Sequence, residues 1–225
     1  MSRLIVINLG LPKSGTTTLA HALRKAGLKA LDHRIRRKDT ENTDLHGRFV
    51  AGQMYHGYFK SGDPLETLSE FDGFGEINLM RRGHSIWPQT DWEVIRALRD
   101  HHPGVRFLAS SRDPMSQAPS MLRWSDMSTT RLPRSSVPGL PRGYGQTTHE
   151  RARWIKGHHD FLRQVFRDAS DFLEYDVADP EAPARIGAFI GRYLPWWGRL
   201  NASSNSKPAK PVKHNKNPHN DPKVA

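Results

Sequence analysis

The stretch that decides the fold is residues 4–18, Leu-Ile-Val-Ile-Asn-Leu-Gly-Leu-Pro-Lys-Ser-Gly-Thr-Thr-Thr. It opens with a short β-branched apolar run, which is typical of a strand buried on both faces. A glycine-containing loop follows. The next residues then predict a helix, because Leu19 and Leu23 share one helical face and Gly27 marks its end. Residues 28–31 predict a second strand, and the order strand, loop, helix, strand is typical of a parallel α/β sheet.

The rest of the chain continues the alternation of strands and helices. We expect strands at 105–111 and 172–177, and helices at 90–102, from 114, at 147–168 and from 179 through 190. Residues 131–145 are rich in Pro, Gly, Ser and Arg, which predicts a mobile loop. The fold class predicted is therefore α/β, with a central parallel sheet flanked by helices. We expect one domain over residues 1–200 and a flexible basic tail rich in Lys, Pro and Asn over residues 201–225.

Composition excludes several classes of protein. The chain has 225 residues and no cysteine, so disulfide scaffolds, zinc–cysteine sites and thiol nucleophiles are excluded. It contains no run of 18 uncharged apolar residues, and its start does not have the pattern of a signal peptide. We therefore expect no membrane span and a cytoplasmic location. The net charge of +11 favours anionic partners such as phosphates, sulfates or nucleic acid.

The loop before the first helix has the properties of a phosphate site. Backbone N–H groups at a helix N-terminus point at an anion, and the helix dipole favours negative charge there. Lys13 adds a positive charge, and four hydroxyl side chains add donors. The loop residues that we expect to bind a phosphorylated cofactor are Pro12, Lys13, Ser14, Gly15, Thr16, Thr17 and Thr18.

The order of residues in this loop disfavours an ATP site. An ATP-type loop has its lysine after the second glycine, whereas Lys13 precedes Gly15 and the loop is shorter. An ordinary strand-to-helix turn with an exposed lysine is the structural alternative.

Residues 11–18, Leu-Pro-Lys-Ser-Gly-Thr-Thr-Thr, resemble the 5′-phosphosulfate loop of the sulfotransferases that use 3′-phosphoadenosine-5′-phosphosulfate (PAPS). The resemblance implies a P-loop NTPase-like sulfotransferase fold, of the kind found in small bacterial members of that superfamily. It implies that Lys13 contacts the oxygen bridging sulfate and phosphate, and that the loop holds the 5′-phosphate. It also implies 3′,5′-adenosine bisphosphate as product and no requirement for a metal.

The same family binds the 3′-phosphate with an arginine at the end of a strand and a serine eight residues later. In this chain Arg112 follows the strand predicted over 105–111, and Ser120 lies eight residues after it. Arginine suits this role because its planar fork binds two phosphate oxygens. The alternative is a surface arginine paired with Asp113.

Sulfuryl transfer also needs a base for the acceptor. In small family members an acidic residue follows a Phe-Asp pair, and Glu76 follows such a pair at residues 71–72. His84 is the second candidate, because other branches of the family use histidine. A solvated carboxylate, or a partner of Arg81 or Arg82, is the structural alternative for Glu76. His33 has no motif support, and we expect it to be exposed or to cap a helix.

One loop of the sequence bears on the acceptor. Arg131, Arg134 and Arg142 lie in the predicted mobile loop and favour an anionic or sugar-like acceptor. The sequence thus predicts an enzyme that transfers a sulfuryl group from PAPS to a hydroxyl or amine of a small-molecule or glycan acceptor. A nucleotide or small-molecule kinase and a basic nucleic-acid-binding protein remain as alternatives, with nucleic acid the less favoured partner.

Overall fold

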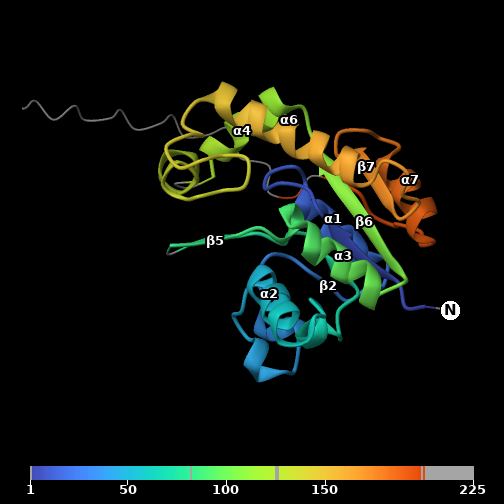
Figure 1. Ribbon diagram of the computed structural model, residues 1–225. Coiled ribbons are helices and arrows are strands. Elements are labelled where there is room, and N and C mark those ends of the chain that lie inside the picture. Colours follow the sequence, from blue (N-terminus) through green and yellow to red (C-terminus); the bar gives the residue numbers. More distant parts are fainter. Residues whose placement is uncertain (1, 82, 125–126, 199, 201–225) are drawn as a thin grey trace, which may run out of the picture.

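A computed structural model of the chain describes residues 2–81, 83–124, 127–198 and 200, so the predicted tail lies outside the described residues (Figure 1). Its centre is a five-stranded parallel sheet in the order β2-β3-β1-β6-β7. The strands are β1 (Ile5–Asn8), β2 (Ala30–Leu31), β3 (Gly73–Phe74), β6 (Val105–Ser111) and β7 (Phe172–Asp176). The predicted α/β fold with a central parallel sheet is confirmed.

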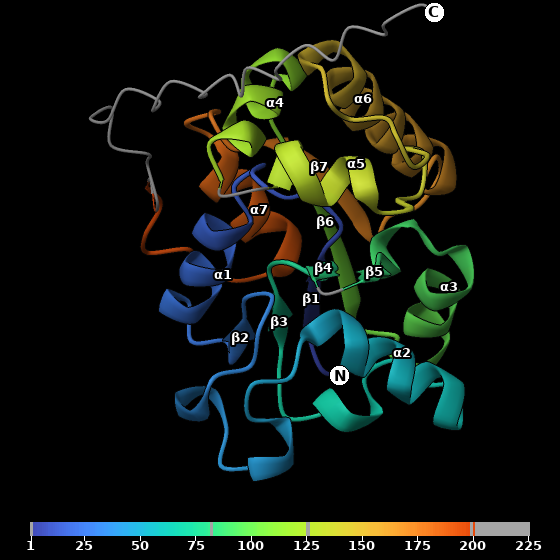
Figure 2. The ribbon, with the colours of Figure 1, turned by 90° about the vertical axis from the view of Figure 1, so that its left-hand side faces the viewer.

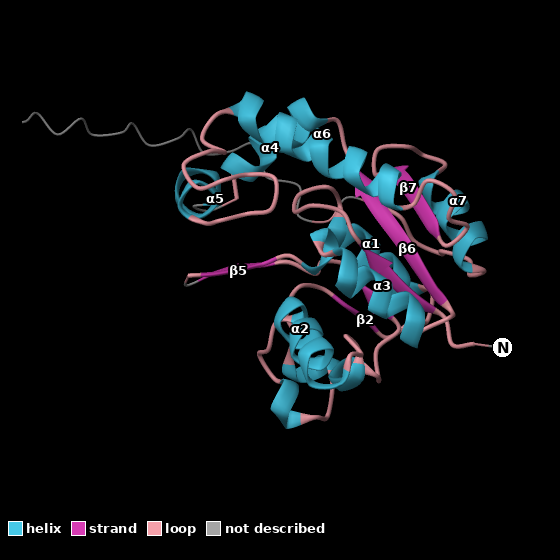
Figure 3. Cartoon of the chain, viewed as in Figure 1, coloured by secondary structure: helices cyan, strands magenta, loops and turns pink. Residues whose placement is uncertain are grey.

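Helices cover both faces of this sheet (Figures 1 and 3). They are α1 (Thr16–Lys25), α2 (Val50–Ser61), α3 (Trp92–His101), α4 (Pro114–Leu122), α5 (Leu132–Arg134), α6 (Thr148–Val165) and α7 (Ala182–Ile190), with short helices η1 (Arg37–Asp39), η2 (Thr43–Leu45), η3 (Glu66–Leu68), η4 (Pro88–Thr90) and η5 (Met127–Arg131). Successive residues of a strand face opposite sides of a sheet. Accordingly, Val6 packs with α1 and α7, whereas Ile5 and Ile7 pack with α2, α3 and α6. No helix among the described residues is long and apolar enough to cross a membrane.

The connections reverse direction between β1 and β6. From β1 the chain runs through α1 to β2 and β3 on one side of β1, whereas from β6 it runs to β7 on the other side. In open parallel sheets, ligands bind outside the carboxyl ends of the strands at such a switch point. The loop at 9–15 and residues 110–112 both lie at this edge.

A two-stranded antiparallel hairpin extends from the same edge of the sheet (Figures 1 and 2). It consists of β4 (Leu79–Arg81) and β5 (His84–Ile86), neither of which is predicted from the sequence.

The predicted mobile loop at 131–145 is more ordered than expected. It contains α5, and its residues Leu132, Val137 and Leu140 are buried in a cluster with α4 and α6. Three apolar anchors among its Pro, Gly and Arg residues explain why the segment packs.

Candidate functional site

We use the name phosphate loop for residues 9–15, which the sequence predicts to bind a phosphate. This loop packs closely against β6. A Cβ added to Gly10 would lie 2.2 Å from Ser110 Oγ and 2.6 Å from its carbonyl oxygen, so no larger residue fits without a shift. Ser14 is fully buried, and its hydroxyl donates to the Leu11 carbonyl at 2.7 Å. The hydroxyls of Ser14 and Ser110 are also hydrogen-bonded at 2.6 Å. The first turn of the loop is therefore set by β6.

Asn8, the last residue of β1, joins the strand ends in one buried network. Its Nδ2 donates to the Gly75 carbonyl at 2.8 Å and to Ser110 Oγ at 3.0 Å. Its Oδ1 accepts from the backbone N–H groups of Gly10, at 3.2 Å, and Ser110, at 2.9 Å. One amide side chain thus fixes the ends of β1, β3 and β6 relative to one another.

Lys13 has an unusual backbone. Its φ is +69°, and no other non-glycine residue in the described part of the chain has a positive φ. Its Nζ lies 5.5 Å from the centre of the Trp124 ring. Burial lowers the pKa of Lys13, the charge of Glu76 opposes this, and the charges of Arg123 and Arg112 lower it further. The loop therefore presents its cation close to two arginines.

Arg112 is half-buried directly after β6, where the sequence predicts it. It makes no side-chain hydrogen bond or ion pair with any described residue. The alternative partner, Asp113, instead accepts hydrogen bonds from the N-terminus of α4 and from the Ser116 hydroxyl at 2.7 Å. Arg112 and Lys13 thus influence each other electrostatically, and neither is neutralised by an ion pair within the described structure.

Helix α4 supports the loop from the other side. Gln117 Nε2 donates to the Pro12 carbonyl at 2.9 Å. Ser120 lies one turn further along, is buried, and makes no hydrogen bond to a described residue. Because Ser116 is engaged with Asp113, only Ser120 of the two serines keeps a spare hydroxyl.

Glu76 is buried immediately after β3, unlike the solvated carboxylate considered as an alternative. The Thr16 hydroxyl donates to its Oε2 at 2.8 Å, and Asn78 Nδ2 lies 3.4 Å from its Oε1. Burial raises the pKa of Glu76, and the nearby charge of His33 opposes that rise. The carboxyl group is thus bonded to the first residue of α1 and has more affinity for a proton than usual.

The sequence predicts His84 as a candidate base and His33 as an exposed or capping residue, and the structure places them differently. His84 is exposed at the tip of the β4–β5 hairpin, and the described contacts do not bring it to the phosphate loop. His33 is half-buried just beyond β2. The Asp32 carboxylate, whose Oδ1 lies 3.8 Å from His33 Nδ1, raises the pKa of His33, and the charge of Glu76 reinforces this effect. The sequence signal for His33 is its place in the chain: Asp32 and His33 directly follow the predicted second strand, at the carboxyl edge of the sheet.

The threonines that follow the loop also differ from one another. Thr17 is half-buried and its hydroxyl makes no hydrogen bond to a described residue. The hydroxyl of Thr18 donates to the Gly198 carbonyl at 3.1 Å, beside a contact of Trp196 with His21. Thr18 therefore fastens the C-terminal segment onto α1.

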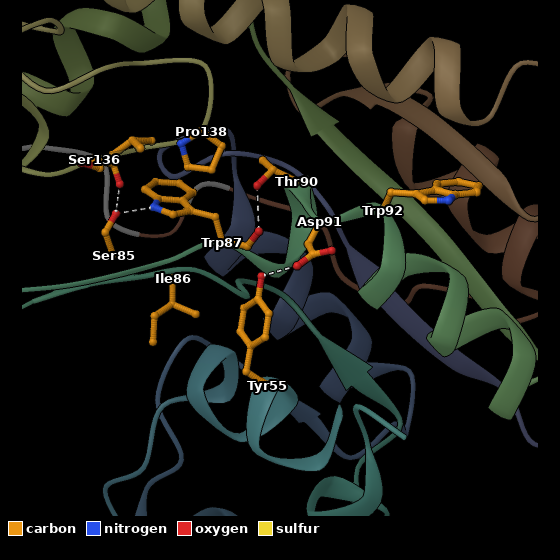
Figure 4. Close-up of a pocket in the computed structure, with 10 residues that line it drawn as sticks. Tyr55, Ser85, Ile86, Trp87, Thr90, Asp91, Trp92, Ser136 and Pro138 are labelled. Carbon is orange, nitrogen blue, oxygen red and sulfur yellow. Dashed lines mark hydrogen bonds between the residues drawn. The ribbon is translucent and has the colours of Figure 1, made fainter. Parts of the chain in front are cut away.

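A separate cavity of about 710 Å³ lies between the hairpin, α2 and the start of α3 (Figure 4). Tyr55 donates to Asp91 Oδ2 at 2.8 Å, Trp87 Nε1 donates to Ser85 Oγ at 2.9 Å, and Ser85 donates to the Ser136 carbonyl at 2.7 Å. None of its described lining residues belongs to the phosphate loop.

Comparison of the chain with models of known protein families finds no match, and comparison with curated protein sequences finds none.

Proposed function

We propose that the protein is a PAPS-dependent sulfotransferase with a P-loop-type fold. The observation that carries the proposal is the pair Lys13 and Arg112, at the carboxyl ends of the neighbouring strands β1 and β6. Each is free of ion pairs to described residues, and each influences the other electrostatically. Two separate cationic points beside a helix N-terminus suit a nucleotide with two separate phosphate groups.

The order of residues favours this donor over Mg-ATP. Thr16 occupies the position after Gly15 where an ATP-type loop has lysine, and its hydroxyl is bonded to a carboxylate. A kinase is therefore the less supported alternative.

The residues of the site fit an in-line displacement. Bound PAPS would supply the sulfuryl group and a phosphate leaving group. Lys13 would stabilise negative charge on the leaving oxygen, which is the most effective role for a fixed cation in a partly desolvated site. Gly15 and Thr17 would orient the 5′-phosphate, and Arg112 with Ser120 the 3′-phosphate. Ser14, whose hydroxyl and backbone N–H are both engaged within the loop and with β6, would hold the loop in shape.

Glu76 would take the proton of the acceptor. Its raised pKa makes it a stronger base than an exposed carboxylate, provided that it is ionised at the working pH. Its hydrogen bond with Thr16 joins the base to the first turn of α1. Activity should consequently fall as the pH drops through the raised pKa.

Thermal unfolding in 3′,5′-adenosine bisphosphate, Mg-ATP or buffer tests the proposal. A ligand at about 100 times its Kd adds ~2.7 kcal/mol, which is a rise in Tm of roughly 5–10 °C for a chain of this size. We expect this rise with the bisphosphate only, and its loss in Lys13→Ala and Arg112→Ala but not in Arg153→Ala, an exposed position on α6. A rise with Mg-ATP alone would instead support a kinase.

A further inference from the structure

A cationic cluster beside the candidate base has no role in the proposed cofactor site. It consists of Arg34, Arg81 and His33, which surround the ring of Phe49 at the start of α2. The guanidinium carbons of Arg34 and Arg81 lie 5.6 and 5.9 Å from the ring centre, and the His33 ring centre lies 6.1 Å away. We call this group the Phe49 cluster.

The two arginines of the Phe49 cluster are available for a ligand. Neither forms an ion pair with a carboxylate of a described residue. Arg34 is held in place, because its Nε donates to the Gly47 carbonyl at 3.1 Å and its backbone pairs with that of Phe49. Both residues are exposed. Exposed guanidinium groups without an internal anion are suited to bind a carboxylate or sulfate through paired hydrogen bonds.

The Phe49 cluster is continuous with the proposed catalytic residues. The charge of His33 acts on Glu76, and the raised pKa of His33 favours its cationic form. The chain also runs from Glu76 into β4, which ends at Arg81. At about 3.3 Å per residue, the two residues are at most roughly 17 Å apart along the backbone. An acceptor that bridges this distance with the help of the two side chains meets both the base and the arginine.

The β4–β5 hairpin runs from the Phe49 cluster to the cavity of about 710 Å³ described above. Arg81 pairs with His84 and Leu79 pairs with Ile86, and alternate residues of a strand share a face, so these four lie on the same side of the hairpin. Ile86 lines the cavity together with Tyr55 of α2 (Figure 4). Tyr55 follows Phe49 by six residues, or about 9 Å along the helix.

We propose that the groove between the β4–β5 hairpin and α2 binds the sulfuryl acceptor, and that this acceptor is a hydroxylated molecule carrying its own carboxylate or sulfate. Its anionic group binds Arg34 and Arg81. Its less polar part extends toward Tyr55 and Ile86 in the cavity (Figure 4). This inference rests on the proposed function, and it names the class of substrate.

Two matched compounds test the groove directly. para-Nitrophenyl glucuronide and para-nitrophenyl glucoside differ only in whether the sugar carries a carboxylate or a hydroxymethyl group. Binding is measured by calorimetric titration, and turnover by transfer from radiolabelled PAPS. Because a hydrogen bond to a charged group contributes about 1.5–3 kcal/mol, we expect wild type to favour the glucuronide at least ~10-fold.

The variants Arg34→Gln and Arg81→Gln should each reduce this preference at least several-fold, whereas Arg153→Gln on α6 should leave it intact. Equal binding of the two compounds to wild type, absence of binding of both, or a preference that survives in both variants overturns the inference.

Stabilisation by 3′,5′-adenosine bisphosphate separates the two proposals. If the bisphosphate stabilises wild type and both groove variants, a failed preference overturns only the acceptor site. If it does not stabilise wild type, the proposed function is overturned, and the acceptor assignment with it.

Discussion

The left-handed backbone of Lys13 leads to a prediction that separates strain from charge. An L-residue in this region costs about 1–2 kcal/mol because its Cβ crowds the following carbonyl, and glycine avoids this cost. Lys13→Ala and Lys13→Gly both remove the ammonium group and its contact with Trp124. They differ only in whether a Cβ must occupy a φ of +69°.

We therefore expect Lys13→Gly to be more stable than Lys13→Ala. Glycine also raises the entropy of the unfolded chain, which opposes the effect by about 0.4–1 kcal/mol. The net advantage of glycine should be up to ~1.6 kcal/mol, or at most roughly 3–6 °C in Tm at this size. Equilibrium unfolding in urea measures the difference, and neither variant should be stabilised by 3′,5′-adenosine bisphosphate.

The exposed Lys156 in the interior of α6 provides the matched control. There the backbone is helical, so Lys156→Gly should be less stable than Lys156→Ala by about 0.5–1 kcal/mol. If alanine is also the more stable residue at position 13, then the loop is not strained there and the reasoning fails.

Three further predictions concern pH and packing. Burial lowers the pKa of His158 in the folded protein to about 4, whereas its pKa in the unfolded chain is near 6.5, so the folded state loses stability as the pH falls below about 6.5. Between pH 8 and 5, urea unfolding should show that wild type loses about 2 kcal/mol more than His158→Gln. Equal losses in the two proteins would contradict this. Burial raises the pKa of Glu76, so any stability linked to its protonated form is lost as the pH rises through that pKa. Glu76→Gln, which can still accept from Thr16, should therefore be no less stable than wild type at pH 8 yet transfer sulfuryl groups at least ~100-fold more slowly, and a variant that keeps its rate would exclude Glu76 as the base. Gly10→Ala would force a Cβ to within 2.2 Å of Ser110 Oγ and should cost about 1–3 kcal/mol in thermal unfolding, whereas an unchanged Tm would show that the loop can move away from β6.

The parts of the fold that the sequence predicts are those with strong local signals. β1, α1, β6 and β7 each have an apolar run or a periodic face within a few residues. The short strand β3 was missed because it consists of Gly73 and Phe74 alone, and it is a strand through pairing with both β1 and β2. Its existence is set by distant residues, which local patterns do not record.

In the candidate site, too, some features follow from local sequence patterns and others depend on distant residues. The sequence motifs assign Lys13 and Arg112 to one cofactor, and the parallel strands β1 and β6 end at the same edge of the sheet. The burial of Glu76, and the charge on it from His33, depend on how β2 and β3 are placed beside β1. Thr18 is engaged by Gly198, which is 180 residues away, and no local signal predicts that contact.

The phosphate loop combines features that each disfavour folding and together suit the proposed binding of a phosphorylated cofactor. Lys13 has a costly backbone and is partly desolvated, and burial makes ionisation of Glu76 unfavourable. The surrounding structure is rigid enough to hold them, because the Asn8 network and the Ser14–Ser110 bond fix the loop before any ligand arrives. A cation and a base held in this way need little reorganisation during a reaction, which is the condition under which electrostatic stabilisation of a transition state is largest. The strain at Lys13 and the proposed chemistry are therefore linked, and the alanine and glycine variants should separate them.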